Sequence, residues 1–310
     1  LKERLLVLTG PQGNHVEDVK ECYYYLDSTP SHAYMKALYK YPQEEFPYKR
    51  LIEENATRGK DKPEFEIMDT GIFHGNKYFD VFAEYAKNSP NDVLIRITVA
   101  NRGLEPALLH VLPTLWFRNS WSWGQTHESR SVKPSIAREK DNLLSATHES
   151  LGRLLFAFGP SPDGKTPPVL FTENETNLQR LYNVPNPSPC VKDAFHECLV
   201  HGQEDAITPN GHGTKAAPHY VLHVPAGESQ TIRLRLYSAD EVPAKLLDKE
   251  FDAIFAARIR EAYEFYASIL PPQTTEAERY IQRQAYAGLL WTKQFYHFIT
   301  QDWLSGDPSM

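Results

Sequence analysis

The segment 108–124, LLHVLPTLWFRNSWSWG, has the residue types of a carbohydrate-binding surface. It begins as a strand and ends in Arg118, Trp121 and Trp123. Indole faces stack on the apolar C–H faces of a sugar ring, and a guanidinium group donates hydrogen bonds to hydroxyls. We therefore expect these three side chains to line a ligand cleft. The alternative interpretation is that the two indoles close the end of a β-sandwich core.

Two further segments carry side chains that could bind sugar hydroxyls. The polar loop 10–18, GPQGNHVED, offers Asn14, His15, Glu17 and Asp18. Near the C-terminus, the sequence LWTKQFYH places Lys293, Tyr296 and His297 at helical spacing. If these three residues face the mouth of a helical barrel, they are expected to bind substrate, whereas an outward orientation would make them a solvated polar face.

Catalytic carboxylates are harder to assign. An inverting glycosidase needs an acid and a base about 6.5–9.5 Å apart. Carboxylates near predicted strand ends are Glu17, Asp18, Asp69, Asp80 and Glu84. Their spacing pairs no two of them, so the sequence favours a solvated surface position for each.

The sequence predicts no metal and no cofactor. His219 and His223 lie four residues apart on a predicted strand, which separates them by roughly 13 Å and is too far for two ligands of one ion. The glycine-rich turns lack the Lys-Ser/Thr pair of a phosphate loop, and no Gly-x-Ser-x-Gly nucleophile motif occurs.

Composition excludes several classes of protein. The chain has 310 residues, a formal net charge of -7 and no long Lys/Arg run, which argues against a nucleic-acid partner. No apolar run approaches the roughly 18–20 residues of a membrane span, and no secretory signal is visible. Three widely spaced cysteines, Cys22, Cys190 and Cys198, fit a reducing compartment. We therefore expect a cytoplasmic protein that does not bind membranes.

The elements that must position these residues change type along the chain. Strand-like segments separated by turn residues continue to about residue 242, which predicts an antiparallel β-sandwich. A short helix is expected over 46–55, starting at Pro47. We also expect a strand over 64–73, and a hairpin in which 214–224 pairs with 229–238.

Helical periodicity follows. Segment 246–269 has apolar residues at intervals of three and four, and a second helix opens at Thr274 with Glu276 and Glu278 in its first turn. The apolar stripe of this second helix is wider than one face, so it requires neighbours on several sides. The predicted domains are a β domain over 1–242 and the first helices of an incomplete α domain over 243–310.

Four strings together resemble a known family. They are EDVKECYYYLDSTPSHAYMKALYKYPQEEFPY, FDVFAEYAKNSPNDVLIRITVANRG, the 108–124 string given above, and RQAYAGLLWTKQFYH. The chain resembles the N-terminal part of large glucosidases related to glycoside hydrolase family 63 and the mannosylglycerate-hydrolase-like group. The resemblance implies a mainly β fold, an antiparallel β-supersandwich followed by a six-hairpin α/α barrel that is truncated here.

The same resemblance implies an inverting enzyme that acts on α-glucosidic or related bonds. The family's acid lies in a Trp-Asp context within the barrel, and no Trp-Asp pair occurs in this sequence. Both catalytic carboxylates are therefore expected beyond Met310, and the 310 residues alone are expected to be inactive. The chain would be either a fragment or a natural short form.

Two other functions stay open. A non-catalytic carbohydrate-binding β-sandwich would carry the same exposed tryptophans without chemistry. An assembly domain would instead use its C-terminal helices to dock another polypeptide or a second copy of itself, because an unpartnered amphipathic helix pair exposes a large apolar patch.

Overall fold

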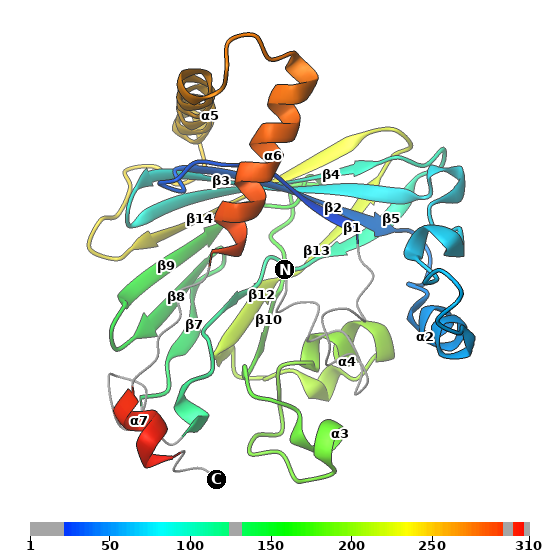
Figure 1. The fold of residues 1–310 in the computed structure, drawn as a ribbon. Helices are drawn as coiled ribbons and strands as arrows, with labels where there is room; N and C mark the ends of the chain where they lie inside the picture. Colours follow the sequence, from blue (N-terminus) through cyan, green and yellow to red (C-terminus); the bar gives the residue numbers. More distant parts are fainter. Residues whose placement is uncertain (1–21, 124–131, 294–299, 307–310) are drawn as a thin grey trace.

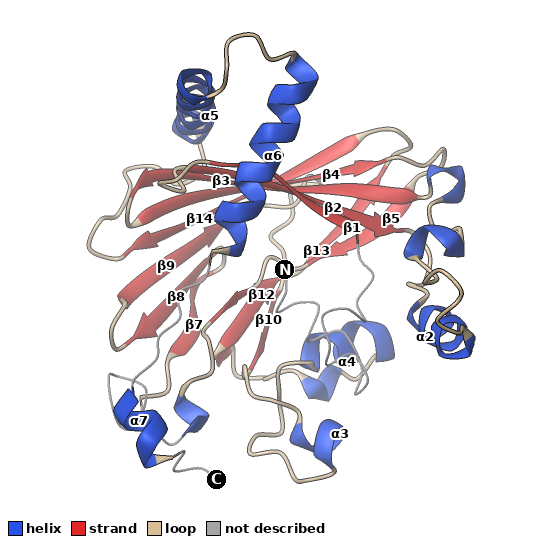
Figure 2. Cartoon of the chain, viewed as in Figure 1, coloured by secondary structure: helices blue, strands red, loops and turns tan. Residues whose placement is uncertain are grey.

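A computed structural model of the chain describes residues 22–123, 132–293 and 300–306. The fold is mainly β, as predicted, and is built around one large antiparallel sheet (Figures 1 and 2). Smaller sheets lie on one face of the large sheet, and two helices lie on the other.

The large sheet contains nine strands in the described part of the chain. Its spatial order is β1 (Cys22–Ser28), β2 (Tyr34–Pro42), β3 (Tyr78–Ser89), β4 (Asp92–Asn101), β14 (Ser229–Ser238), β9 (Gly152–Phe158), β8 (Leu143–His148), β7 (Ser135–Lys140) and β11 (His212–Gly213). All pairs are antiparallel.

Two small sheets form the second layer. One pairs β13 (Tyr220–Val224) with β5 (Ala107–Val111), and the other has the order β10 (Val169–Thr172), β12 (Lys215–Pro218), β6 (Leu115–Trp116). The predicted single strand through 108–117 is therefore interrupted around Pro113, which lacks the N–H that a ladder requires. Its burial is also one-sided, since Leu109 is buried while Leu108 is 49% exposed.

The main hydrophobic core lies between the two layers. Phe79, Val99, Phe156 and Leu234 of the large sheet are all buried against side chains of the second layer such as Tyr220. Alternate residues of each strand point to this core, because successive side chains of a strand point to opposite faces. The large sheet, the two small sheets and the core between them make up the antiparallel sandwich predicted from strand spacing.

Six α-helices occur in the described residues. They are α2 (Tyr48–Thr57), α3 (Leu178–Tyr182), α4 (Ala194–His201), α5 (Lys249–Ile269), α6 (Glu276–Thr292) and α7 (Thr300–Ser305). The helix predicted over 46–55 is confirmed as α2, with Pro47 as its N-cap residue.

Helix α5 covers the outer face of the large sheet. Phe251 and Phe255 are 0% and 1% exposed and pack against Tyr34, Ala86 and Leu94. The large sheet is consequently buried on both faces where α5 crosses it.

Helix α6 crosses β1 at the edge of the large sheet (Figure 1). It begins with a capping box between Thr275 and Glu278. Its buried Arg283 pairs with Asp27 of β1, and Trp291 donates from Nε1 to the Asp27 carbonyl at 3.1 Å. The Trp291 ring also stacks on Tyr25 with centroids 5.1 Å apart.

The strand predicted over 64–73 is wrong. Phe65 and Ile67 are buried alternately, as a strand would have them, but the chain then forms 3-10 turns at Ile67–Thr70 and His74–Asn76. The Asn55 side chain of α2 accepts from the Phe65 N–H at 2.7 Å and donates to the Phe65 carbonyl at 3.0 Å. The Asn55 side-chain amide therefore makes the two backbone hydrogen bonds to Phe65 that a neighbouring strand would make.

The predicted hairpin of 214–224 with 229–238 is also wrong. Strand β13 pairs with β5, while β14 pairs with β4 and β9. The turn at 225–228 thus carries the chain from the second layer into the large sheet.

None of the helices in the described residues combines the length and the apolarity needed to span a bilayer. No disulfide joins any of the three cysteines.

Candidate functional site

The end of the three-stranded small sheet, around β6 and β10, is fixed by buried hydrogen bonds between side chains and backbone. The Asn174 amide donates to the Phe117 carbonyl at 2.7 Å, and the Asn174 N–H donates to Thr214 Oγ1 at 2.7 Å. Gly213 lies so close to this junction that a Cβ there would come 2.3 Å from the Thr172 carbonyl oxygen. These contacts hold the segment that follows β6 against the segment that follows β10.

Trp121 lies at this junction in a 3-10 turn, Trp121–Trp123. Its half-buried indole packs against the main core, and its Nε1 donates to Glu175 Oε1 at 3.2 Å. Lys133 Nζ donates to the same oxygen at 2.9 Å and lies 3.2 Å from Glu173 Oε2. We call Trp121, Lys133, Glu173 and Glu175 the Trp121 cluster.

Electrostatics in the Trp121 cluster favour the charged form of Lys133. Burial alone would lower the pKa of Lys133, but hydrogen bonds to Glu175 and Glu173 outweigh it and raise that pKa above its ordinary value. One ammonium group thus bridges two carboxylates, of which Glu175 is 8% exposed. Thr214 Oγ1 also donates to Glu173 Oε2 at 2.7 Å.

This arrangement differs from the separated acid and base of an inverting glycosidase, because one ammonium group bridges Glu173 and Glu175. An indole fixed in orientation beside charged hydrogen-bonding groups can instead stack on a sugar ring and bind its hydroxyls.

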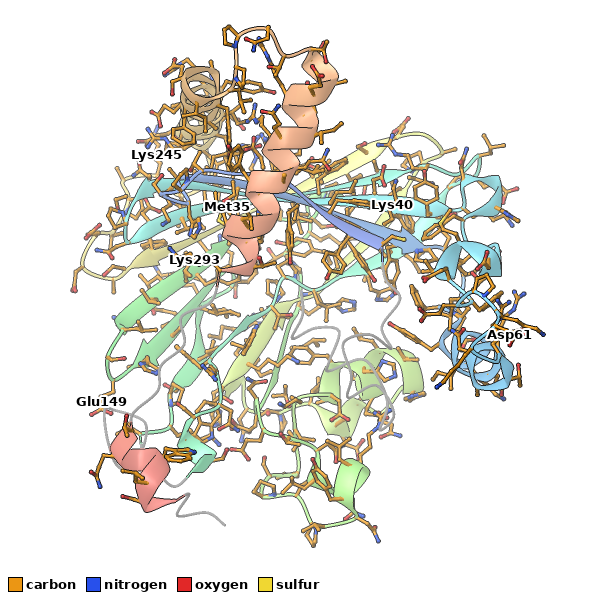
Figure 3. All side chains as sticks on the ribbon, viewed as in Figure 1. Met35, Lys40, Asp61, Glu149, Lys245 and Lys293 are labelled. Atoms are coloured by element: carbon orange, nitrogen blue, oxygen red, sulfur yellow. The ribbon has the colours of Figure 1, made fainter. Side chains whose placement is uncertain are left out.

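The structure describes only some of the residues predicted for the site. Arg118 is exposed, directly after β6, and Trp121 is half-buried. Lys293 is exposed at the C-terminal end of α6 (Figure 3). The pKa of His32 is lowered mainly by burial, and the positive charges of Lys87 and Lys293 lower it further. No contact between described residues brings Lys293 to Trp121.

The other predicted site residues lie outside the described part of the chain. They are Asn14, His15, Glu17, Asp18, Tyr296 and His297, and the same holds for the side chain of Trp123.

Two carboxylates expected at a solvated surface are in fact buried. Asp80 accepts from Lys40 and from Arg102 at 2.7 Å each, and Glu84 accepts from Arg96 at 2.9 and 3.0 Å. Ion pairing explains the difference, because a buried carboxylate is tolerated when it is paired and hydrogen-bonded. Asp69 is exposed, as expected.

Sequence reasoning missed Lys133, Glu173 and Glu175. The string TENET, which begins at the last residue of the strand 169–172, was the available signal, because its two Glu residues at i and i+2 fall on one face of an extended chain. Lys133 could not be associated with them, because it precedes β7 of the large sheet and meets the two Glu residues after β10 only through the packing of the two layers.

A second missed feature is Lys215 of β12, which lies opposite Trp116 of β6. Burial lowers the pKa of Lys215 to about 8, with Lys192 adding to the effect. Lys215 Nζ donates to the Lys192 carbonyl at 2.7 Å and lies 5.0 Å from the Phe195 ring centre. These contacts attach the start of α4 to the outer face of the small sheet.

Sequence reasoning also missed a contact between two histidines of different strand segments. His219 contacts His110, not His223, with 2.7 Å between Nε2 and Nδ1 and the rings stacked. Burial and then the neighbouring His110 lower the pKa of His219.

No family model matches the chain. The uncharacterized protein YMR196W of Saccharomyces cerevisiae is 42% identical over 348 aligned residues, which cover 100% of this chain and 32% of the yeast protein. The chain therefore spans about a third of the length of this curated relative. A solved structure, the polysaccharide lyase BACCELL_00875, matches 69% of this chain and 22% of its own with 10% identity and a TM-score of 0.35.

Proposed function

We propose that this chain is the N-terminal portion of a cytoplasmic, inverting, α-glucosidase-like glycoside hydrolase, and that it shapes one wall of the carbohydrate cleft. The Trp121 cluster, with the exposed Arg118 beside it in the chain, is the observation that carries the proposal. Its indole is held by a hydrogen bond and by the core, so little conformational entropy is lost when a sugar ring stacks on it.

Two further points support an enzyme of greater length. The four strings that resemble the glucosidase family include both the Trp121 segment and the segment of α6. The yeast relative is about three times as long as the aligned region, which leaves room for a helical barrel that carries the acid and the base. Helices α5 and α6 would then be the β-to-α transition of such an enzyme.

A titration of the 310-residue chain with gluco-oligosaccharides of different α-linkages tests this proposal. We expect weak binding that quenches tryptophan fluorescence, and no release of reducing sugar. Trp121→Phe, which keeps a ring in the core but loses the N–H, should reduce the quenching and the affinity. Trp116→Phe is the matched control, five residues away on β6, and should leave both unchanged.

Three outcomes would contradict parts of the proposal. Hydrolysis by the 310 residues would show that catalysis does not depend on a missing barrel. Loss of quenching in the Trp116→Phe variant, but not in Trp121→Phe, would move the site to the α4 side of the small sheet. Sugar binding without hydrolysis by the full-length yeast relative would favour a non-catalytic carbohydrate-binding module.

An assembly role is a second candidate, favoured by one surface of α6. Ile281 and Leu289 are 67% and 71% exposed, and with Ala285 they form an apolar stripe at intervals of four residues. This stripe would pack against further helices of a longer chain or against a second copy.

A further inference from the structure

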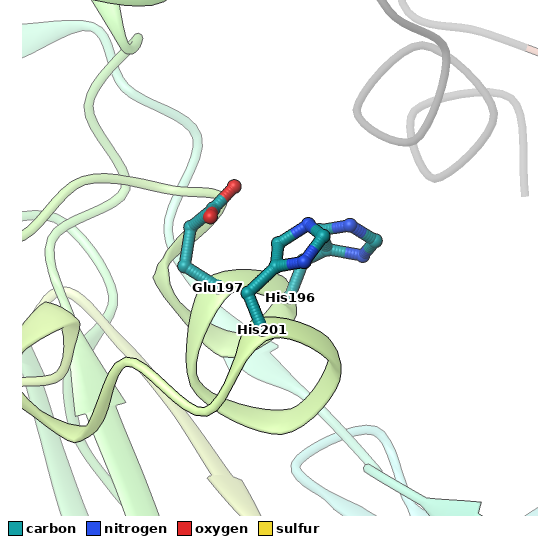
Figure 4. Close-up of side chains that lie close together, drawn as sticks. All are labelled: His196, Glu197 and His201. Atoms are coloured by element: carbon teal, nitrogen blue, oxygen red, sulfur yellow. The ribbon is translucent and has the colours of Figure 1, made fainter.

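Helix α4 brings three metal-binding side chains together, at a place that the carbohydrate proposal does not use. His196, Glu197 and His201 each offer a ligand atom, and these atoms lie within 4.8 Å of one another (Figure 4). The two imidazole rings meet edge to face with centroids 5.1 Å apart. We propose that these three residues bind a divalent transition-metal ion of the zinc class.

The geometry needs only side-chain adjustment to hold an ion. Zn–N bonds of about 2.0–2.1 Å in a tetrahedral site place ligand atoms roughly 3.4 Å apart. The ligand atoms now lie within 4.8 Å of one another, so small rotations of these half-buried or exposed side chains would bring them to bonding distance of one ion. Within the described residues, neither imidazole has a hydrogen-bond partner, so ligation breaks no bond of theirs.

The helix that carries the site packs against the three-stranded small sheet. Ala194 and Phe195 are 3% and 7% exposed, and Phe195 packs against Leu170 and Ala217 of the small sheet. Just before the helix, the Lys192 carbonyl accepts a hydrogen bond from Lys215. The helix ends at His201, followed by Gly202 in a left-handed conformation with φ 70°. His201 thus belongs to the last turn, and the four residues between it and His196 fall within the H-x3–5-H spacing seen in zinc sites.

The carboxylate of Glu197 already has an outer partner. Arg180 Nη1 donates to Glu197 Oε1 at 3.2 Å and to Asp193 Oδ2 at 3.2 Å. Asn177 donates to both oxygens of Asp193 at 3.2 and 3.0 Å. Hydrogen bonds of this kind orient ligating carboxylates in metal sites. The second oxygen of Glu197 is left to face the ion.

The donor set selects the class of ion. Two imidazole nitrogens and one carboxylate oxygen suit Zn²⁺, Co²⁺, Ni²⁺ or Cu²⁺, whereas Ca²⁺ and Mg²⁺ prefer oxygen ligands alone. Three protein ligands on an accessible surface leave at least one coordination position for water or for an anionic group of another molecule. The bound ion would link the first turn of α4 to its last and so stabilise the helix.

Titration of the full 310-residue chain with Co²⁺ and Zn²⁺ tests the proposal. We expect one equivalent of Co²⁺ to give visible d–d absorption bands, Zn²⁺ to displace it, and Mg²⁺ to leave the spectrum unchanged. His196→Ala, Glu197→Gln and His201→Ala should each weaken Co²⁺ binding at least about tenfold, since each removes one of three ligands.

Matched variants show whether the ion binds elsewhere. His223→Ala removes an exposed histidine outside the cluster, and His110→Ala removes the other close histidine pair, so both should bind Co²⁺ as the parent chain does. Circular dichroism of each variant confirms folding before titration. Binding that survives His196→Ala and His201→Ala together, or that is lost in His110→Ala, would overturn the assignment, and so would a parent chain that binds no Co²⁺ at neutral pH.

Discussion

Arg235 on β14 is a fully buried charge of the large sheet, and it is paired with a buried carboxylate. Arg235 is 1% exposed, and it donates to Asp92 from Nε at 2.8 Å and from Nη2 at 2.6 Å. Its Nη1 donates to the carbonyls of Lys245 and Leu246. One guanidinium therefore joins β14, β4 and the segment that leads into α5.

Arg235→Leu should destabilise the chain by about 3–5 kcal/mol, because it leaves Asp92 as an unpaired buried charge. Arg233→Leu is the matched control on the same strand, since the exposed Arg233–Asp252 pair contributes at most about 1 kcal/mol. Urea unfolding followed by far-UV circular dichroism measures both. Equal losses in the two variants would contradict the structural role assigned to Arg235.

The loss of folding stability at acidic pH should depend on Glu84. Burial alone would raise its pKa, but hydrogen bonds from Arg96 and Tyr34 outweigh that effect and the pKa is lowered from 4.5. A carboxylate with a lowered folded-state pKa contributes stability that is present above its unfolded pKa and is lost as the pH falls through the folded value.

Glu84→Gln should therefore lower the free energy of unfolding at pH 7 by about 1–3 kcal/mol, as expected for a lost hydrogen bond to a charged group. Its stability should also decline less steeply than that of the parent chain below pH 4.5. Glu228→Gln, at an exposed turn, is the control and should follow the parent curve. Parallel curves for Glu84→Gln and the parent chain would refute the assignment.

At the scale of elements, the sequence predicted what depends on local pattern. The strand predicted over 229–238 matches β14, and the helix predicted over 46–55 matches α2 to within two residues. In 229–238, however, apolar residues alternate with Arg233 and Arg235, a pattern that places Arg235 on a polar face, and the segment before α5 covers that face. Burial on the second face of a sheet is decided by distant elements, so a strand's own pattern does not reveal it.

The candidate site was predictable to a similar extent. The position of Trp121 at a strand end follows from the segment 108–117, but its partner Glu175 lies 54 residues away. The turn at 225–228 is compatible with a local hairpin or a crossing between layers, and pairing of β13 with β5 decides between them. Non-local register is the information that a single sequence lacks.

A substitution at Gly213 tests how closely β10 and β11 pack where they meet. Gly213→Ala would place a Cβ 2.3 Å from the Thr172 carbonyl oxygen, so the contact between β10 and β11 must open. We expect a loss of about 1–3 kcal/mol, the usual cost of overpacking. Gly227→Ala is not an equivalent control because its φ is 69°, whereas Gly288→Ala on α6 meets no atom within 4 Å and should be neutral or slightly stabilising. Thermal unfolding compares the two.

At the scale of the whole molecule, α6 has two different surfaces. One contains Arg283, Ala287 and Trp291, which face the large sheet and its edge strand β1. The other is the stripe of Ile281, Ala285 and Leu289, which nothing in the described part of the chain covers. Contiguous exposed apolar surface of this kind is typical of interaction sites.

The 310-residue chain should therefore self-associate through α6 in a concentration-dependent manner. Ile281→Glu combined with Leu289→Glu should abolish the association without unfolding the protein, because both side chains are more than 60% exposed. Val200→Glu, at a site of similar exposure on α4, is the control and should associate like the parent chain. Sedimentation velocity over a range of concentrations distinguishes these outcomes. If the parent chain stays monomeric, or if Val200→Glu removes association equally, the stripe is not a self-association surface, and docking against further helices of a longer chain becomes the favoured use of α6.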